Sequence, residues 1–333
     1  MFRRFRLFDD VRLQWIVVLA LVVAPIALAR PQPARAATIP PNFADSLVTQ
    51  IGRPTGLAFT PDGRMLVTTQ GGTVRVFQGN TLLPTPALDL SAKVCSNRER
   101  GIASVAIDPN FTSNRRIYLY YTFKKHGVCP TPEDSLDLSQ FPVNRVSRFI
   151  LSDANVINPN DEFVLVDNIP STGNHNAGDL HFGANGLLYV SVGDGGCRVT
   201  DLTRCQSAND NSRSLTHLLG KVLRVRTDGT FSIRNPYAGE ADVRRCGDPR
   251  GVPAGTGKCG EIFATGLRNP FRMAFKPGTD TFHINDVGGA TWEEVNLGIK
   301  GADYGWNVRE GHCLRGSRTD CPPPGAFTDP IYD

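Results

Sequence analysis

The stretch DLHFGANGLLYVSV, residues 179–192, decides the fold class of this chain. Two short runs of alternating apolar residues flank a Gly-Ala-Asn-Gly turn, a pattern typical of two antiparallel strands joined by a tight connection. Three other segments repeat this order: GLAFTPDGRMLVTT (56–69), SVAIDPNFTSNRRIYLYYT (104–122) and RMAFKPGTDTFHIND (272–286). Repeated strand–turn–strand units predict an all-β propeller, and no long helical period competes with them. A β-sandwich with long loops is the alternative, but four versions of one phrase favour the propeller.

The first 36 residues have the features of a signal peptide. Arginines precede the apolar run Trp15–Ala29, and small residues at 34–36 suit a cleavage site before Ala37. The run is short for a membrane span, although an uncleaved anchor is the alternative. We therefore expect a signal peptide over 1–36 and a propeller over 37–333, exported to the periplasm or the medium, with no membrane attachment after cleavage.

The charge of the chain gives no support for binding to nucleic acid. The leader contains six Arg and two Asp, a net charge of +4 that equals the formal charge of the whole chain. The remainder is balanced, with 30 basic and 30 acidic residues. A neutral surface lacks the electrostatic attraction that polyanions require. Nucleic acid is therefore not an expected partner.

Eight cysteines in an exported chain favour disulfides over zinc, and none of them forms a C-x-x-C pair. Sequence cannot prove the connectivity. Spacing predicts local pairs, and elimination leaves the most distant one: Cys197–Cys205, Cys246–Cys259, Cys313–Cys321 and Cys95–Cys129.

His175 is the first candidate for chemistry. It lies in the loop NHNAG before the strands of 179–192, and loops on a rigid β scaffold often carry functional side chains. Its ordinary pKa suits proton abstraction near neutral pH. Asp194 ends the hairpin that begins after His175, so the two can return to one rim. A solvated loop histidine beside a turn aspartate is the alternative.

Two further segments carry polar residues in turns. Arg268 and Asn269 precede Pro270, and a guanidinium beside an amide can bind carbonyls, carboxylates or sugar hydroxyls. An exposed polar turn is the alternative. Gly288-Gly289 allows backbone carbonyls to face a cation, and Glu294 follows closely, although the spacing is not that of an EF-hand.

These stretches together resemble the soluble PQQ-dependent glucose/sorbosone dehydrogenase family, which includes aldose sugar dehydrogenases. The family fold is a six-bladed β-propeller, which agrees with the repeats. The resemblance covers most of residues 54–308. The matching segments occur in family order: ERGIASVAIDPNF, NHNAGDLHFGANGLLYVSVGDGG, LLGKVLRVRTDG, ATGLRNPFRMAF and GGATWEEVNLGIKGADYGWN.

The resemblance implies a catalytic centre that oxidises a sugar. His175 matches the general base, which takes the proton of the sugar C1 hydroxyl while hydride moves to PQQ. Asp194 matches the carboxylate that is paired with this base. Arg268 and Asn269 match the residues that contact the quinone and polarise its reacting carbonyl. The implied partners are a small-molecule sugar substrate and an electron acceptor.

The resemblance also implies calcium. Gly288 and Gly289 match the positions whose carbonyls hold the calcium on PQQ, and Glu294 and Tyr304 resemble ligands of a second, structural calcium. Glu99 occupies a cofactor-contacting position that is often Gln in the family. Its charge would face the carboxylates of PQQ unless calcium or a neighbouring arginine compensates.

The chain also departs from the family at its end. The final segment GAFTDPIYD starts a strand without a closing blade, so we expect the C-terminal part of the propeller to be missing. The family's later Lys and Arg contacts to PQQ fall in that part. A non-catalytic propeller that binds carbohydrate or protein is therefore the main alternative function. A calcium-dependent hydrolase such as a lactonase is a third, but the sequence shows no convergent cluster of carboxylates and amides.

Overall fold

The computed structural model describes residues 39–130, 142–196, 210–251, 257–323 and 325–333. The predicted signal peptide and the predicted Cys197–Cys205 pair lie outside these residues. The chain divides into two compact units, Met1–Leu47 and Val48–Asp333. In the first unit, the described residues contain one turn, at 41–42. Across the described part of the chain, no helix is long and apolar enough to cross a membrane.

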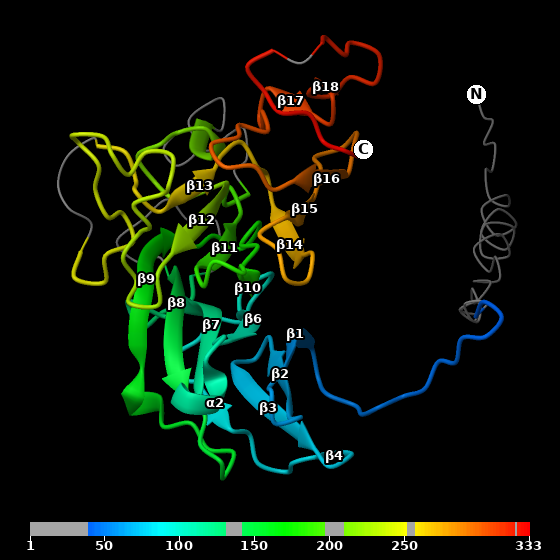
Figure 1. Cartoon of the computed structure of the whole chain (residues 1–333), viewed down its shortest axis with the longest axis vertical. Coiled ribbons are helices and arrows are strands. Elements are labelled where there is room, and N and C mark those ends of the chain that lie inside the picture. Colours follow the sequence, from blue (N-terminus) through cyan, green and yellow to red (C-terminus); the bar gives the residue numbers. More distant parts are fainter. Residues whose placement is uncertain (1–38, 131–141, 197–209, 252–256, 324) are drawn as a thin grey trace, which may run out of the picture. The chain divides into compact units, whose positions relative to one another are not determined.

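Four antiparallel sheets, which we call blades 1 to 4, follow one another along the second unit (Figure 1). Blade 1 contains β1 (Pro54–Phe59), β2 (Met65–Thr69), β3 (Thr73–Gln78), β4 (Thr81–Leu82) and β5 (Leu88–Asp89). Blade 2 contains β6 (Ile102–Ile107), β7 (Arg116–Phe123), β8 (Val143–Ile150) and β9 (Phe163–Pro170). Blade 3 contains β10 (Leu180–Phe182), β11 (Leu188–Val192), β12 (Lys221–Val225) and β13 (Ile262–Ala264). Blade 4 contains β14 (Pro270–Phe275), β15 (Phe282–Asp286) and β16 (Glu294–Leu297).

The remaining elements are short. A two-stranded hairpin of β17 (Arg309–Glu310) and β18 (Cys313–Leu314) follows blade 4. Tyr332 then forms an antiparallel bridge with Val295 of β16. Helical structure among the described residues is confined to single turns, as the sequence predicts: α2 (Phe111–Asn114), η1 (Pro159–Asp161) and η2 (Asp210–Ser212).

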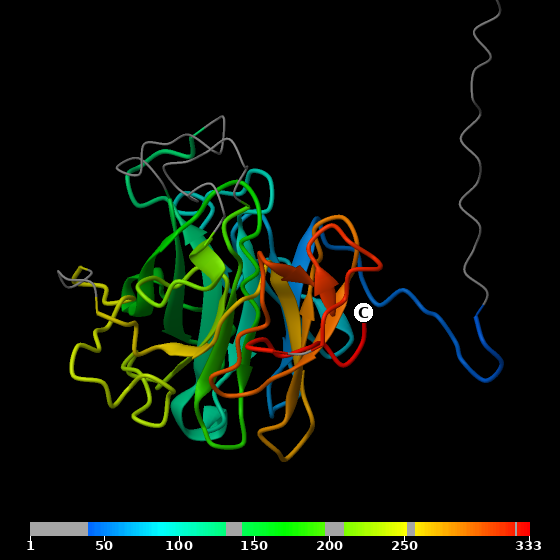
Figure 2. The same ribbon diagram turned by 90° about the horizontal axis from the view of Figure 1, so that it is seen from above.

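The four repeated phrases form the first two strands of the four blades, as predicted. Neighbouring blades contact through their first strands, β1 with β6, β6 with β10 and β10 with β14 (Figure 1), and Figure 2 shows the same succession from above. A cavity of about 510 Å³ is lined by residues of all four first strands. The arrangement is a propeller rather than a sandwich, and the count of six blades stays a prediction.

Apolar side chains fill the space between successive blades. Successive side chains of a strand point to opposite faces of its sheet, and apolar residues on both sets of positions give each blade two apolar faces. One cluster joins blades 1 and 2 and includes Leu66, Val74 and Leu119. A second joins blades 2 and 3 around Tyr118 and Val190. The third joins blades 3 and 4 through aromatic residues, among them Tyr189, Phe263 and Phe282. These interfaces hold the first strands in a fixed arrangement around the cavity.

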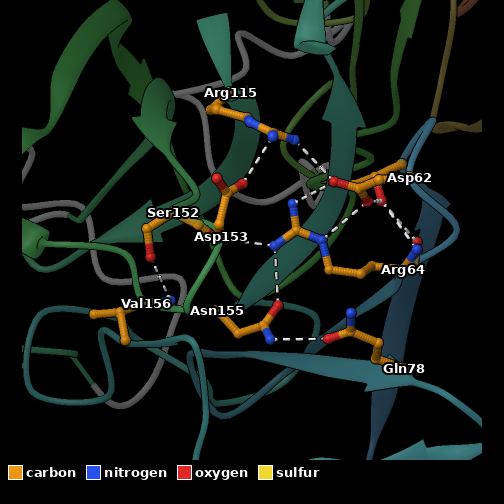
Figure 3. Close-up of polar contacts among 9 residues, drawn as sticks. Asp62, Arg64, Gln78, Arg115, Ser152, Asp153, Asn155 and Val156 are labelled. Carbon is orange, nitrogen blue, oxygen red and sulfur yellow. Dashed lines mark hydrogen bonds and ion pairs between the residues drawn. The ribbon is translucent and has the colours of Figure 1, made fainter.

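Arg64 adds a polar clamp between blades 1 and 2 (Figure 3). Its side chain is only 2% exposed and donates to both carboxylate oxygens of Asp62 at 3.0 and 2.8 Å. It also donates to the Ser152 carbonyl and to Asn155 Oδ1, both at 2.9 Å. These hydrogen bonds from Arg64 hold the pKa of Asp62 well below its ordinary value. A buried guanidinium with this many acceptors fixes the turn of blade 1 against the hairpin loop that follows β8.

Three of the four predicted disulfides are confirmed: Cys95–Cys129, Cys246–Cys259 and Cys313–Cys321. Cys95–Cys129 brackets β6 and β7 of blade 2, both cysteines of Cys246–Cys259 belong to the second apolar cluster, and Cys313–Cys321 closes the segment that begins in β18. Disulfides of this kind restrict the unfolded chain and suit a protein that folds in an oxidising compartment. They support the predicted export of the chain.

His217 makes the stability of the fold depend on pH. Burial, together with the charges of Lys221 and Arg244, lowers the pKa of His217 to about 3, and its Nδ1 has no hydrogen-bond partner among the described residues. The unfolded chain takes up a proton near pH 6.5, whereas the folded chain keeps this imidazole neutral. The stabilisation is therefore complete above pH 6.5 and is lost as the pH falls towards 3.

We expect the free energy of unfolding to fall by about 2 kcal/mol more in the parent chain than in a His217→Gln variant between pH 7 and pH 5. Urea unfolding at both pH values measures this difference. An identical loss in the two proteins would show that His217 does not titrate in this way.

Candidate active site

One rim of the propeller brings together the segments that the sequence singled out. In antiparallel blades, the residues before the first strand and those after the second strand lie at the same end. His175 precedes β10 and Asp194 follows β11, while Arg268 and Asn269 precede β14. The pairing of the first two strands is irregular near this end in blades 1, 2 and 4. Such bulges redirect the chain and often occur next to functional sites.

His175 and Asp194 form a hydrogen-bonded pair. The distance from His175 Nδ1 to Asp194 Oδ1 is 2.7 Å, and the two side chains are 17% and 1% exposed. With a proton on Nδ1, His175 donates to the carboxylate and keeps the lone pair of Nε2 available. Among the described residues, none binds Nε2 by a hydrogen bond. The pair therefore has the arrangement of an oriented base.

Asp194 is held as a carboxylate by further donors. Its Oδ1 accepts from Gly196 N at 2.8 Å, and its Oδ2 accepts from the Trp306 indole at 2.8 Å. Burial alone would raise the pKa of Asp194, but the hydrogen bonds from His175, Gly196 and Trp306 outweigh burial and leave this pKa below its ordinary value. Asp194 is therefore ionised at neutral pH.

The backbone around His175 adopts an uncommon conformation that its neighbours hold in place. His175 has a φ of 51° and Ala177 a φ of 46°. The Glu99 carboxylate accepts from His175 N at 2.6 Å, and Asn269 Oδ1 accepts from Ala177 N at 3.1 Å. A Cβ on Gly193 would lie 2.0 Å from the His175 carbonyl oxygen, so only glycine fits there. Left-handed backbone at a non-glycine residue is strained, and such residues concentrate at functional sites.

Glu99 thus has a structural contact at the position predicted to touch the cofactor. Its side chain is exposed, and one of its oxygens fixes the backbone of the predicted base. Arg100, next in sequence, is fully buried and donates to the carbonyls of Ser171 and Thr172 at 3.0 Å each. These bonds hold the start of the segment that leads to His175.

Arg268 and Asn269 begin blade 4 beside the pair. The Asp286 carboxylate accepts from both of their backbone N–H groups, at 2.8 and 2.6 Å. The Arg268 guanidinium donates to the Val287 carbonyl at 3.0 Å and lies 5.4 Å from the centre of the Trp306 ring. The Arg268 carbonyl accepts from Asp194 N at 2.8 Å. The structure therefore brings the predicted catalytic and cofactor residues together.

The predicted metal ligands lie in two places. Gly288 and Gly289 are in the loop after β15, where a Cβ on Gly289 would lie 3.2 Å from the Trp306 ring. Glu294, at the start of β16, pairs with Asp286 in the sheet and accepts from Gly311 N at 2.6 Å. Burial raises the pKa of Glu294, and the nearby carboxylates of Asp333 and Glu310 raise it further.

Tyr304, the last predicted metal ligand, belongs to the third apolar cluster. Its hydroxyl donates to the Leu297 carbonyl at 2.5 Å and accepts from Ile299 N at 3.1 Å. Burial raises its pKa to about 12, so this hydroxyl is neutral at physiological pH.

Two residues of the site, Trp306 and Glu310, were not predicted from the sequence. Trp306 binds Asp194 across 112 positions, and Glu310 accepts from backbone groups of the loop after β15. No periodicity or spacing in the sequence distinguishes Trp306 and Glu310, each of which lies next to a glycine, from ordinary loop residues.

Comparison with known proteins identifies the family. The profile of the family "Glucose / Sorbosone dehydrogenase" matches residues 51–320. Aldose sugar dehydrogenase YliI of Escherichia coli (strain K12) is 29% identical over 262 residues, which is 78% of this chain and 60% of that protein. The human Hedgehog-interacting protein is 26% identical over 276 residues, 78% of this chain and 36% of its own length.

A solved structure agrees with the fold. The PQQ-bound form of aldose sugar dehydrogenase from Streptomyces coelicolor superposes with a TM-score of 0.61, covering 85% of this chain and 68% of that one at 24% identity. The present chain spans no more than 60% of the length of the two curated relatives. Because the family profile covers most of the sequence, this chain belongs to the glucose/sorbosone dehydrogenase family.

Proposed function

We propose that this chain is part of an exported PQQ-dependent oxidoreductase that oxidises an aldose or a related alcohol. Membership of the family supports an oxidoreductase of this superfamily. The observation that carries the proposal is the His175–Asp194 pair, with 2.7 Å between nitrogen and oxygen at the propeller rim. An imidazole oriented by a buried carboxylate is suited to removing a proton from a hydroxyl group.

The proton step follows from the contacts of the pair. Nε2 of His175 would accept the proton of the C1 hydroxyl as the C1 hydrogen leaves with its electron pair. Asp194 keeps the ring in the correct tautomer and stabilises the positive charge that then develops. A positioned base of this kind contributes about 10²- to 10⁴-fold to the rate.

The residues present fit PQQ and a first calcium ion. Arg268 would contact the quinone with its guanidinium and Asn269 with its amide, whose nitrogen forms no hydrogen bond within the described residues. The carbonyls of Gly288 and Gly289 accept no hydrogen bond from the described residues, and calcium binds such oxygens. PQQ would supply the hydride acceptor, and calcium would make its reacting carbonyl more electrophilic.

A second calcium ion is supported mainly by Glu294. Its carboxylate lies close to other carboxylates, and a divalent cation would neutralise their repulsion. The Tyr304 hydroxyl already binds Leu297 and Ile299, so it adds less support to this site. At Glu99, the bond to His175 N occupies one carboxylate oxygen but does not remove the charge next to the proposed cofactor.

Titration of the purified chain with PQQ in the presence of calcium tests the proposal. We expect saturable binding to one class of sites and dye reduction on a panel of aldoses that requires both PQQ and calcium. Removal of calcium by a chelator should abolish the dye reduction. Absence of PQQ binding by the calcium-loaded chain would contradict the proposal.

A non-catalytic binding module is the second candidate function. The similarity to the human Hedgehog-interacting protein, whose name describes a protein interaction, favours it. A module of this kind would bind a protein or carbohydrate without oxidising sugars. Carbohydrate or protein binding by a chain that binds no PQQ would support this candidate.

A further inference from the structure

Glu310 has an unusual set of contacts. It ends β17, in the hairpin next to the Cys313–Cys321 disulfide, and is only 2% exposed. One oxygen, Oε1, accepts from four consecutive backbone N–H groups at 2.8, 2.8, 2.7 and 3.1 Å, those of residues 289, 290, 291 and 292. Converging backbone N–H groups form a concave anion site, and here an internal carboxylate fills it.

The direction of these N–H groups fixes the direction of the carbonyls. In a trans peptide, the carbonyl of one residue points opposite to the N–H of the next. The cis peptide found among the described residues is Trp306–Asn307, so the peptides of this loop are trans. The carbonyls of Gly288 and Gly289 therefore point away from Glu310 Oε1. These are the two carbonyls proposed to hold calcium.

The carboxylate of Glu310 suits this arrangement, because four donors converge on one of its oxygens and the residue is shielded from water. Hydrogen bonds to an ionised acceptor are about twice as strong as those between neutral groups. Loss of the charge would leave the same four donors with a weaker acceptor.

The same loop also lies against Trp306, which binds the carboxylate of the His175–Asp194 pair. A Cβ on Gly289 would lie 3.2 Å from the Trp306 ring, and the Trp306 indole donates to Asp194. A shift of the loop would therefore alter both the direction of its carbonyls and the surface that supports Asp194.

We infer that Glu310 is a positioning residue, which holds the loop of residues 288–292 so that the carbonyls of Gly288 and Gly289 point outward from the loop and stay available to a divalent cation. The inference rests on the proposed function, because that function supplies the calcium ion. Glu310 itself does not touch the ion in this proposal. Its role is to keep the two ligands in place before the ion binds.

Two measurements without PQQ test this role. Amide hydrogen exchange of residues 289–292 is measured in the metal-free chain, and calcium affinity is measured by calorimetry. Glu310→Gln should speed exchange at these amides at least about tenfold and weaken calcium binding by about tenfold, since the four donors are left with a neutral and weaker acceptor. Glu310→Asp, which keeps the charge, should change exchange and calcium affinity less than Glu310→Gln does. It is the second test variant if Glu310→Gln folds poorly.

Glu261→Gln is the matched control. Glu261 is also a buried glutamate that accepts two loop amides, those of Cys246 and Gly247, but it lies in blade 3. The Glu261→Gln substitution should leave amide exchange at residues 289–292 and calcium affinity unchanged. Unaltered exchange and affinity in Glu310→Gln would overturn the inference. If the parent chain binds no calcium, the proposed function fails, and slow exchange at these amides in Glu310→Gln would refute the ordering role separately.

Discussion

Replacing His175 by alanine should lower kcat for aldose oxidation about a thousandfold in the PQQ- and calcium-loaded chain. The side chain provides the proposed base, and no other described group is positioned to replace it at Asp194. Its loss removes one of the three hydrogen bonds described for the buried Asp194 carboxylate, so we expect the free energy of unfolding to fall by only about 1 kcal/mol and PQQ affinity to change little. Steady-state dye reduction, thermal unfolding and a PQQ titration measure the three quantities.

His181→Ala is the matched control for this prediction. His181 also pairs with a carboxylate, at 3.1 Å from Asp179, but it lies within β10 and lines the cavity between the blades. Its loss should change kcat by less than about threefold, since it contributes no proton transfer. A His175→Ala variant that retains more than a tenth of the parent activity would show that another group is the base.

Asp194→Asn should lower kcat by about 10²- to 10⁴-fold although it changes only one atom of the side chain. The two carboxylate oxygens of Asp194 accept hydrogen bonds from His175 Nδ1, Gly196 N and Trp306 Nε1. The Asn side chain has one oxygen and one NH₂ group. Its NH₂ group must therefore face at least one of these three donors, where no hydrogen bond can form. An NH₂ group facing His175 would favour the tautomer with its proton on Nε2, which cannot act as a base.

The same donor conflict should reduce stability. A buried donor without an acceptor costs about 1–3 kcal/mol, so we expect a loss of this size in the free energy of unfolding. Denaturant unfolding separates this loss from the catalytic defect, because kcat is measured on the folded fraction. Activity of Asp194→Asn within tenfold of the parent chain would contradict the role assigned to the carboxylate.

Much of the fold could be predicted from the sequence because its signals are local. The four repeated phrases place a turn between two alternating strands, and each phrase forms one antiparallel pair in the structure. The loops between these pairs have no common length, and the sequence contains no further copy of the phrase. The repeats therefore account for four blades, and the described residues also form four. The count of six stays a prediction.

The candidate site could be predicted only in part. His175 and Asp194 flank one hairpin, so their approach follows from antiparallel geometry. Trp306 and Glu310 reach the site from later segments, and their contacts depend on how blade 4 and the following hairpin pack. The bond from Glu99 to His175 likewise joins two blades. Contacts of this kind have no sequence period, so a single sequence does not reveal them.

Anaerobic mixing of the PQQ- and calcium-loaded chain with an aldose tests whether the chain transfers hydride from sugar to cofactor. The absorbance spectrum of the cofactor reports its reduction without any requirement for an electron acceptor. We expect the parent chain to convert the spectrum to that of the reduced cofactor, and His175→Ala to bind PQQ but leave the spectrum unchanged on the same timescale. A fully loaded parent chain that leaves the cofactor oxidised with every aldose tested would rule out aldose oxidation by His175 and favour a binding module.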